Sequence, residues 1–268
     1  MIRSTFRLVP GVGPWAEGQI WKAGIRTWDD VPAEPGRIYS PRIDPRLREA
    51  IARCAPLLEA RDADALATLV PRAERWRLFA AFASEAAYLD IETDGGDTVT
   101  VIGLLDAHGP RVLLAGRDLD QFPALAAGWK LLVTYNGLSF DVPILRRRFP
   151  DWRPPVAHVD LRHVWHRLGH RGGLKLLELE NGIVRPAHLA GLDGRDAIGL
   201  WQRHLDGDAE ATRLLAEYNL RDTVDLKPLA ERGYNRLVER LGGPAPLVPE
   251  SEFGDLAYDV TRQLLDLA

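Results

Sequence analysis

Apolar residues along this chain follow two different spacings, and the change between them separates strands from helices. Apolar runs bounded by glycine or proline predict five strands, at 86–92, 98–106, 110–115, 131–135 and 156–160. Apolar residues three or four positions apart predict helices, at 118–128, 143–149, 174–183, 193–205 and 209–241. Because a helix crosses to the fourth strand, that strand is expected to pair in parallel with the first. This order of elements predicts an α/β domain with a mixed five-stranded sheet flanked by helices.

The sequence outside this α/β region divides into a helical N-terminal part and a short C-terminal part. Residues 1–83 carry helical apolar periodicity in their second half, which predicts a small helical module packed against the main domain. Within them, 29–45 is rich in Pro, Asp and Gly and is expected to be a linker or long loop. The main domain is expected to span 84–241, its last helix broken or bent near Pro228. Residues 242–268 are expected to form a linker and an amphipathic C-terminal helix, with apolar residues at Leu256, Val260, Leu264 and Leu265.

The composition is that of an ordinary globular protein and excludes several classes. Of 268 residues, 46% are hydrophobic and 27% charged, which allows a sizeable core. The net charge of -4 means that any contact with nucleic acid must come from local basic patches. The single Cys54 excludes an internal disulfide and a cysteine-rich zinc site. With no signal peptide and no long apolar run, we expect a cytoplasmic protein with no membrane contact.

Two acids stand at the end of the first predicted strand. Asp90 and Glu92 are two positions apart, so both side chains project from the same face, about 6–7 Å apart along the chain. Two carboxylates on one face repel each other unless a cation lies between them. Taken alone, the pattern is equally typical of a solvated strand end.

Further acids occur at two later element boundaries. Asp141 lies in the first turn of a helix that follows the fourth strand, just after the turn-forming pair Asn136-Gly137. Much later, Tyr218 and Asp222 are four positions apart in a strongly helical pattern and therefore share one helix face.

The ordered set Asp90-x-Glu92, Asn136-x4-Asp141 and Tyr218-x3-Asp222 resembles the three-part signature of the DnaQ-like 3′–5′ exonucleases of the ribonuclease H-like fold. The Tyr-x3-Asp form resembles their tyrosine-type (DEDDy) branch. The phrase around Asn136 is most similar to bacterial ribonuclease H-like domains known only as predicted exonucleases. The resemblance covers roughly residues 85–240 and implies a ribonuclease H-like sheet.

The resemblance also implies a chemistry and a role for each residue. It implies 3′–5′ hydrolysis of phosphodiester bonds in nucleic acid with two divalent cations, Mg²⁺ or Mn²⁺, about 4 Å apart. The implied metal ligands are Asp90, Glu92, Asp141 and Asp222. Tyr218 would orient the attacking water, and Asn136 would contact substrate or hold its turn.

Two other functions remain open on the same fold. A nucleic-acid binding module without activity usually lacks at least one carboxylate, and here all four are present. An endonuclease or transposase-type nuclease would not require the Tyr-x3-Asp pair. The exonuclease interpretation is therefore favoured over both.

A basic stretch follows the fifth strand and is either a solvated helix face or a wall that contacts phosphate. We favour the wall and take Lys175 as a substrate-binding residue; Asp160, at the strand end, could reach the metal zone without binding it. The adjoining cluster Arg146-Arg147-Arg148 could serve the same purpose. The three histidines here lack a fourth ligand of clear spacing and do not predict a zinc site. The stretch consists of Arg162, His163, His166, Arg167, His170, Arg171 and Lys175.

Near the N-terminus, the segment of about 6–31 resembles a helix-hairpin-helix, in which a Gly-apolar-Gly turn joins two short helices. Backbone N–H groups at such a turn can bind a phosphate without reading sequence, so Gly11 and Gly13 are predicted to contact substrate. The alternative is a structural hairpin without a ligand. The motif favours DNA over RNA as the substrate, which the metal chemistry alone does not decide.

Overall fold

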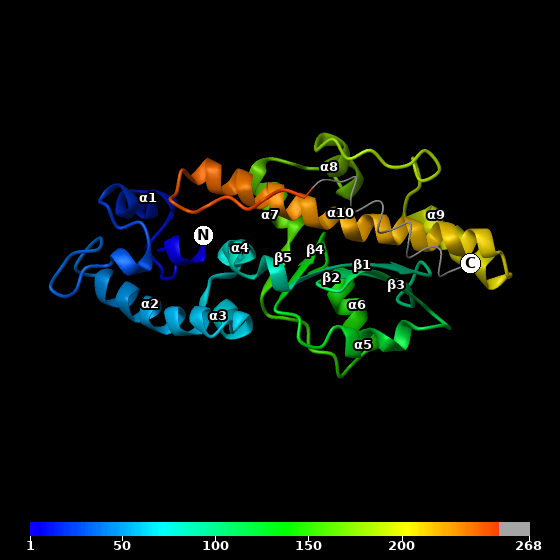
Figure 1. Cartoon of the computed structure of the whole chain (residues 1–268), viewed down its shortest axis with the longest axis horizontal. Coiled ribbons are helices and arrows are strands. Elements are labelled where there is room, and N and C mark those ends of the chain that lie inside the picture. The colour runs from blue at the N-terminus through cyan, green and yellow to red at the C-terminus, as the bar shows by residue number, and fades with distance from the viewer. Residues whose placement is uncertain (252–268) are drawn as a thin grey trace.

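The computed structural model describes residues 1–251, and its centre is a five-stranded mixed sheet (Figure 1). Strands β1, β2 and β3 pair antiparallel, and β4 and β5 continue from β1 in parallel, in the order β3-β2-β1-β4-β5. The predicted α/β architecture and the parallel pairing of the first and fourth strands are confirmed. The strands are β1 Ala86–Thr93, β2 Val99–Asp106, β3 Gly109–Leu114, β4 Leu131–Thr134 and β5 His158–Asp160.

Helices cover both faces of this sheet. The long helix α10 (Ala209–Leu241) crosses one face, and α5 (Phe122–Leu125) and α6 (Asp141–Arg148) lie on the other (Figure 1). Three further helices complete the domain: α7 Leu161–Leu168, α8 Leu174–Glu180 and α9 Gly194–Leu205. The α10 helix continues through Pro228, so the helix is not broken there, and the alternative of a bend stays a prediction.

Alternation along β1 divides its side chains between the two layers. Tyr88 packs in the core beneath α10, whereas Leu89 and Ile91 pack in the core beneath α5 and α6. Because neighbouring strand residues point to opposite faces, Asp90 and Glu92 project toward α10 with Tyr88. The register of β1 against β2 shifts directly after Glu92, a local irregularity that ends the regular ladder at the acids.

A glycine in β2 sets how closely α10 approaches the sheet. Gly103 pairs with Asp90, and a Cβ atom built at Gly103 would lie 2.0 Å from Thr223 Oγ1 and 2.6 Å from Asn219 Oδ1. Both contacts are far too short, so any side chain at this position would push α10 away from β1. The glycine therefore allows the acids of β1 and the polar residues of α10 to meet.

The N-terminal region consists of short helices beside the sheet (Figure 1). They are α1 Pro14–Lys22, α2 Asp44–Glu59, α3 Ala63–Leu69 and α4 Phe79–Phe82, with 3-10 turns η1 Ile2–Ser4, η2 Trp28–Asp30, η3 Arg72–Leu78 and η4 Ala83–Glu85. Another 3-10 turn, η5 Leu119–Gln121, precedes α5, so the helix expected over 118–128 is shorter and irregular.

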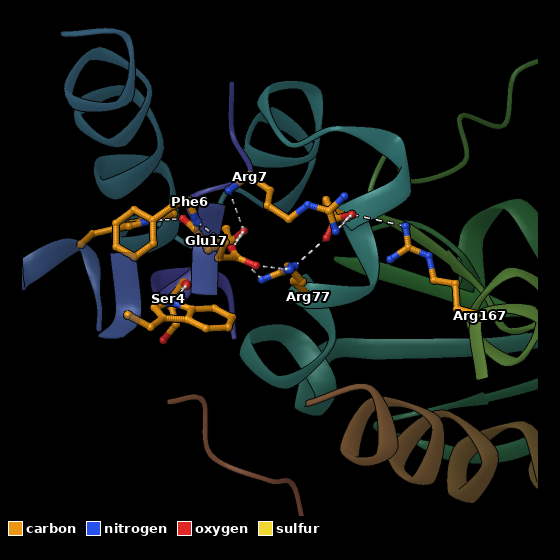
Figure 2. Close-up of polar contacts among 10 residues, drawn as sticks. Ser4, Phe6, Arg7, Glu17, Arg77 and Arg167 are labelled. Atoms are coloured by element: carbon orange, nitrogen blue, oxygen red, sulfur yellow. Dashed lines mark hydrogen bonds and ion pairs between the residues drawn. The ribbon is translucent and has the colours of Figure 1, made fainter. Parts of the chain in front are cut away.

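A buried ionic network joins the N-terminal region to the main domain (Figure 2). Arg77 donates to both carboxylate oxygens of Glu17, at 3.1 and 2.8 Å, and to Glu74 at 2.7 Å. Glu74 in turn forms ion pairs with Arg7 at 2.8 Å and with Arg167 of α7 at 3.2 Å. Since buried charges are costly unless fully paired, this network holds α1, η3 and α7 in one fixed arrangement.

The helix-hairpin-helix expected over 6–31 is wrong in its first half. Residues 5–13 form turns and irregular backbone, and α1 is the one α-helix in the segment. Gly11 has a φ of +99° and lies against Ile43, whose Cδ1 would be 2.9 Å from an added Cβ. The glycine is thus explained by a turn packed on the protein itself, and phosphate binding by Gly11 and Gly13 stays a prediction. The predicted C-terminal amphipathic helix lies outside the described residues.

Candidate active site

Three carboxylates from β1 and α10 converge at one point beside the sheet. One oxygen atom from each of Asp90, Glu92 and Asp222 can be chosen so that all three lie within 4.8 Å of one another. Asp90 and Glu92 come from one face of β1, and Asp222 comes from the face of α10 that packs on it. Residues more than a hundred positions apart in the sequence therefore form one acidic cluster.

A side-chain amide of α10 holds the first of these carboxylates. Asn219 donates from Nδ2 to Asp90 Oδ2 over 2.9 Å, while its own Oδ1 is buried and has no hydrogen-bond partner within residues 1–251. Burial, reinforced by the charges of Asp141 and Asp222, raises the pKa of Asp90 well above its usual value. Burial together with Asp222 raises the pKa of Glu92 to about 8. The cluster is thus electrostatically unfavourable as a set of bare anions.

Asp141, the first residue of α6, lies next to this cluster but is placed differently. Its Oδ1 accepts a hydrogen bond from the backbone N–H of Ile91 over 3.1 Å, between the two acids of β1. Burial raises the pKa of Asp141 to about 7. Among the described residues, the group close enough to share one ion contains the other three acids and not Asp141.

Tyr218 lies one helical turn before Asp222 on α10 and is 3% exposed. Lys175 of α8 donates from Nζ to the Tyr218 hydroxyl, and its ammonium also lies 4.1 Å from the centre of the tyrosine ring. The same Nζ is 4.0 Å from Asp222 Oδ2. Burial, with the nearby charges of Asp222 and Glu92, raises the pKa of Tyr218 above its usual value, so the phenol stays protonated at neutral pH.

Arg185, in the loop after α8, is a residue of this site that the sequence did not single out. Its guanidinium pairs with Glu178 at 2.6 and 2.7 Å and also donates to Asp222. The side chain is 8% exposed, and its Nη1 finds no hydrogen-bond partner in the part of the chain that the structure describes. Arg185 lies in the irregular segment between α8 and α9. Such a segment has no helical or strand periodicity, so the sequence offered no reason to place this arginine at the site.

Asn136 is placed at the turn between β4 and α6, where it adopts a left-handed backbone with φ of +66°. Its backbone N–H donates to Asp160 Oδ1 over 2.8 Å, and its side-chain oxygen accepts from Arg162 over 2.6 Å. Asp160 also accepts from the N–H of Leu138 at 3.1 Å and of Arg162 at 3.0 Å. Asp160 therefore fixes the turn that leads into Asp141.

Part of the basic stretch after β5 is engaged by other groups of the protein, and the phosphate-contacting wall stays a prediction. Arg167 pairs with Glu74, His170 pairs with Glu180 at 2.7 Å, and Arg171 donates to backbone oxygens. Lys175, the last residue of this stretch, contacts both Tyr218 and Asp222.

The donor set fits a hard divalent cation. Carboxylate oxygens are the ligands that Mg²⁺ and Mn²⁺ prefer, and three of them here are directed at one another. The raised pKa values of Asp90 and Glu92 have the same origin, because acids crowded together in a buried place favour either protons or a cation. Asp90, Glu92 and Asp222 could therefore hold a metal ion, with Asp141 beside them.

A mixed β3-β2-β1-β4-β5 sheet with acids gathered at β1 and a late helix defines a domain of the ribonuclease H-like class. A family model described as the RNase H superfamily matches residues 87–234, which is more than half of the chain. The chain belongs to this superfamily. No curated protein and no solved structure gives a significant match.

None of the helices in the described part of the chain is long and apolar enough to cross a lipid bilayer.

Proposed function

We propose that this protein is a metal-dependent 3′–5′ exonuclease that shortens single-stranded nucleic acid. The observation that carries the proposal is the meeting of Asp90 and Glu92 with Asp222, in a domain of the RNase H superfamily. The closeness of Tyr218 to Asp222 on one face of α10 favours an exonuclease of the tyrosine type. The preference for DNA rested on the expected helix-hairpin-helix. Because only one α-helix forms in that segment, which the structure describes in full, we include both DNA and RNA strands as substrates.

The four acids would serve as the metal-binding part of the site. Asp90, Glu92 and Asp222 would hold divalent cations, with Asp141 completing the set from α6. When bound, two Mg²⁺ or Mn²⁺ ions would make a water nucleophilic at neutral pH and neutralise charge on the leaving 3′ oxygen. Asn219 would keep the Asp90 carboxylate in a fixed orientation.

The Tyr218 hydroxyl would position the attacking water. Lys175 donates to the phenol oxygen, which leaves the phenol proton free to be donated to the water. With its pKa raised, the phenol acts as a neutral hydrogen-bonding group and not as a base. The role of Tyr218 would therefore be orientation, which contributes to the rate without binding metal.

Two basic side chains, Lys175 and Arg185, would complete the site beside Asp222. Lys175 and Arg185 both contact Asp222. Positive side chains beside a transferring phosphoryl group stabilise the charge that develops there. These residues would then bind the scissile phosphate.

The proposal is tested by degradation of 5′-labelled DNA and RNA single strands with Mg²⁺ or Mn²⁺. Step-by-step shortening from the 3′ end, lost in chelator, is the expected result. A circular single strand of the same sequence is the control, because an exonuclease cannot begin on it. Cleavage of the circle at a similar rate would indicate an endonuclease, and no cleavage of either would favour a binding module.

A further inference from the structure

A cavity of about 600 Å³ lies where the N-terminal region meets the main domain. Its walls come from η3 on one side and from β5 and α7 on the other. Apolar side chains form part of the lining, among them Trp76, Val159 and Val164, together with Leu138 from the turn that leads to Asp141. The cavity is thus linked to the carboxylate site through the turn of Leu138, and none of the four acids lines it.

Basic side chains outnumber carboxylates in the lining of this cavity. Arg72, Arg75, Arg167 and His163 line it. Arg72 and His163 are exposed and have no ion-pair partner within residues 1–251. Arg75 donates to the backbone oxygens of Ala67 and Val156, both at 3.1 Å, so its charge is not paired by these contacts.

The acids nearest the cavity are already engaged. Asp160, which also lines it, accepts three backbone N–H groups, from Asn136, Leu138 and Arg162. Glu74 is paired with Arg77, Arg7 and Arg167. With three arginines and one carboxylate in its lining, the cavity has a net positive formal charge, and its natural complement is an anion.

The lining also offers a surface for a flat apolar group. Trp76 lines the cavity with the small part of its surface that stays exposed, since the side chain is 5% exposed and its ring packs against Tyr234 and Arg77. Leu138, which also lines the cavity, is 46% exposed and offers an apolar surface. An aromatic and aliphatic pocket rimmed by arginine and histidine matches a nucleobase with its phosphates.

We propose that this cavity binds one nucleotide unit of a single strand, upstream of the 3′ end held at the carboxylates. The base would pack against the exposed side chain of Leu138, and Arg72 and His163 would contact its phosphates. The placement of the 3′ end rests on the proposed exonuclease function, whereas nucleotide binding in the cavity does not. The N-terminal region would thereby supply part of the strand's path.

The test is binding of a fluorescein-labelled ten-nucleotide oligo(dT) by Arg72→Glu, measured by polarisation at several salt concentrations. The Asp90→Asn background prevents cleavage during the measurement. We expect affinity about tenfold lower, and a salt dependence weaker by about one phosphate contact. The control is Arg42→Glu, which makes the same charge change at an exposed arginine without an ion-pair partner in the described chain.

Cross-linking locates the contact directly. Oligonucleotides with 5-iodouracil at successive positions are irradiated on the Asp90→Asn protein, and the attached peptides are identified by mass spectrometry. An internal position should cross-link to peptides from 72–76 or 158–167. Equal weakening by both charge reversals, or absence of these cross-links, would overturn the proposal. If these cross-links form but the parent protein has no nuclease activity, nucleotide binding in the cavity is supported and only the exonuclease function is refuted.

Discussion

Asn219 of α10 donates a hydrogen bond to Asp90 of β1 over 2.9 Å, and this contact joins the two elements that carry the acidic cluster. Asn219 is fully buried, and its closeness to β1 depends on the missing side chain of Gly103. The bond fixes which oxygen of Asp90 remains free toward Glu92 and Asp222. The arrangement of the site is thus set by packing between the helix and the sheet.

Asn219→Ala should weaken metal binding while leaving the fold intact. Partners that orient a metal-binding carboxylate typically contribute 10- to 100-fold in affinity, and a loss of about this size is expected for Mn²⁺ by calorimetry. Asn235→Ala is the matched control, because Asn235 lies on the same helix and bonds to Val248 instead. Equal affinity in both variants would contradict this role of Asn219.

The metal-free protein should lose thermal stability as the pH rises from about 5 to 8.5. The pKa of Glu92 is raised to about 8 and that of Asp141 to about 7, both first by burial. The folded protein therefore keeps protons that the unfolded chain has released, and the stability present at low pH is lost as the pH passes these values. Thermal unfolding in chelator measures this slope, and Glu92→Gln should flatten it. Identical slopes for the two proteins would refute the assignment.

Arg185→Gln should have opposite effects on metal binding and on cleavage. The guanidinium competes with a cation for Asp222, so its removal should tighten Mn²⁺ binding several-fold. Loss of a donor to the scissile phosphate should slow single-turnover cleavage by at least about tenfold. Arg203→Gln, which breaks a surface pair with Asp208, serves as the control. If metal affinity and rate both match the parent, Arg185 has no part in the site.

Tyr218→Phe should slow the chemical step and leave both metal and substrate binding near normal. One positioning hydrogen bond is lost, while phenylalanine fills nearly the same volume, so a rate decrease of roughly 10- to 1000-fold is expected. Single-turnover cleavage with a parallel metal titration checks this. An unchanged rate would exclude the tyrosine-type assignment without affecting the carboxylate cluster.

Much of the sheet could be predicted because strand periodicity is local. Alternation in β1 placed Asp90 and Glu92 on one face, and the structure has both in the cluster facing α10. The strands of the structure agree with the predicted ranges to within about two residues. The glycine at position 103, within an apolar strand, could also have been interpreted as a place where another element approaches the strand closely.

The remaining features depend on contacts that no local pattern encodes. The pairing of Arg185 with Glu178 and Asp222 arises from an irregular segment folding back over α10. The helix-hairpin-helix prediction failed because a Gly-x-Gly sequence indicates a turn but does not determine what flanks it. Gly11 is required by its positive φ and its contact with Ile43, neither of which involves a ligand.

The central claim is that the cluster of Asp90, Glu92 and Asp222 hydrolyses nucleic acid with bound metal. Its most direct test is single-turnover cleavage of a 5′-labelled linear strand by Asp222→Asn, compared with the parent protein. Asp225→Asn is the control, since Asp225 is also a buried acid of α10 but lies outside the cluster. The account predicts a loss of more than about a thousandfold for Asp222→Asn, because removing a ligand costs several kcal/mol of transition-state stabilisation, and near-parent cleavage for Asp225→Asn. Cleavage by folded Asp222→Asn as fast as by the parent would contradict it.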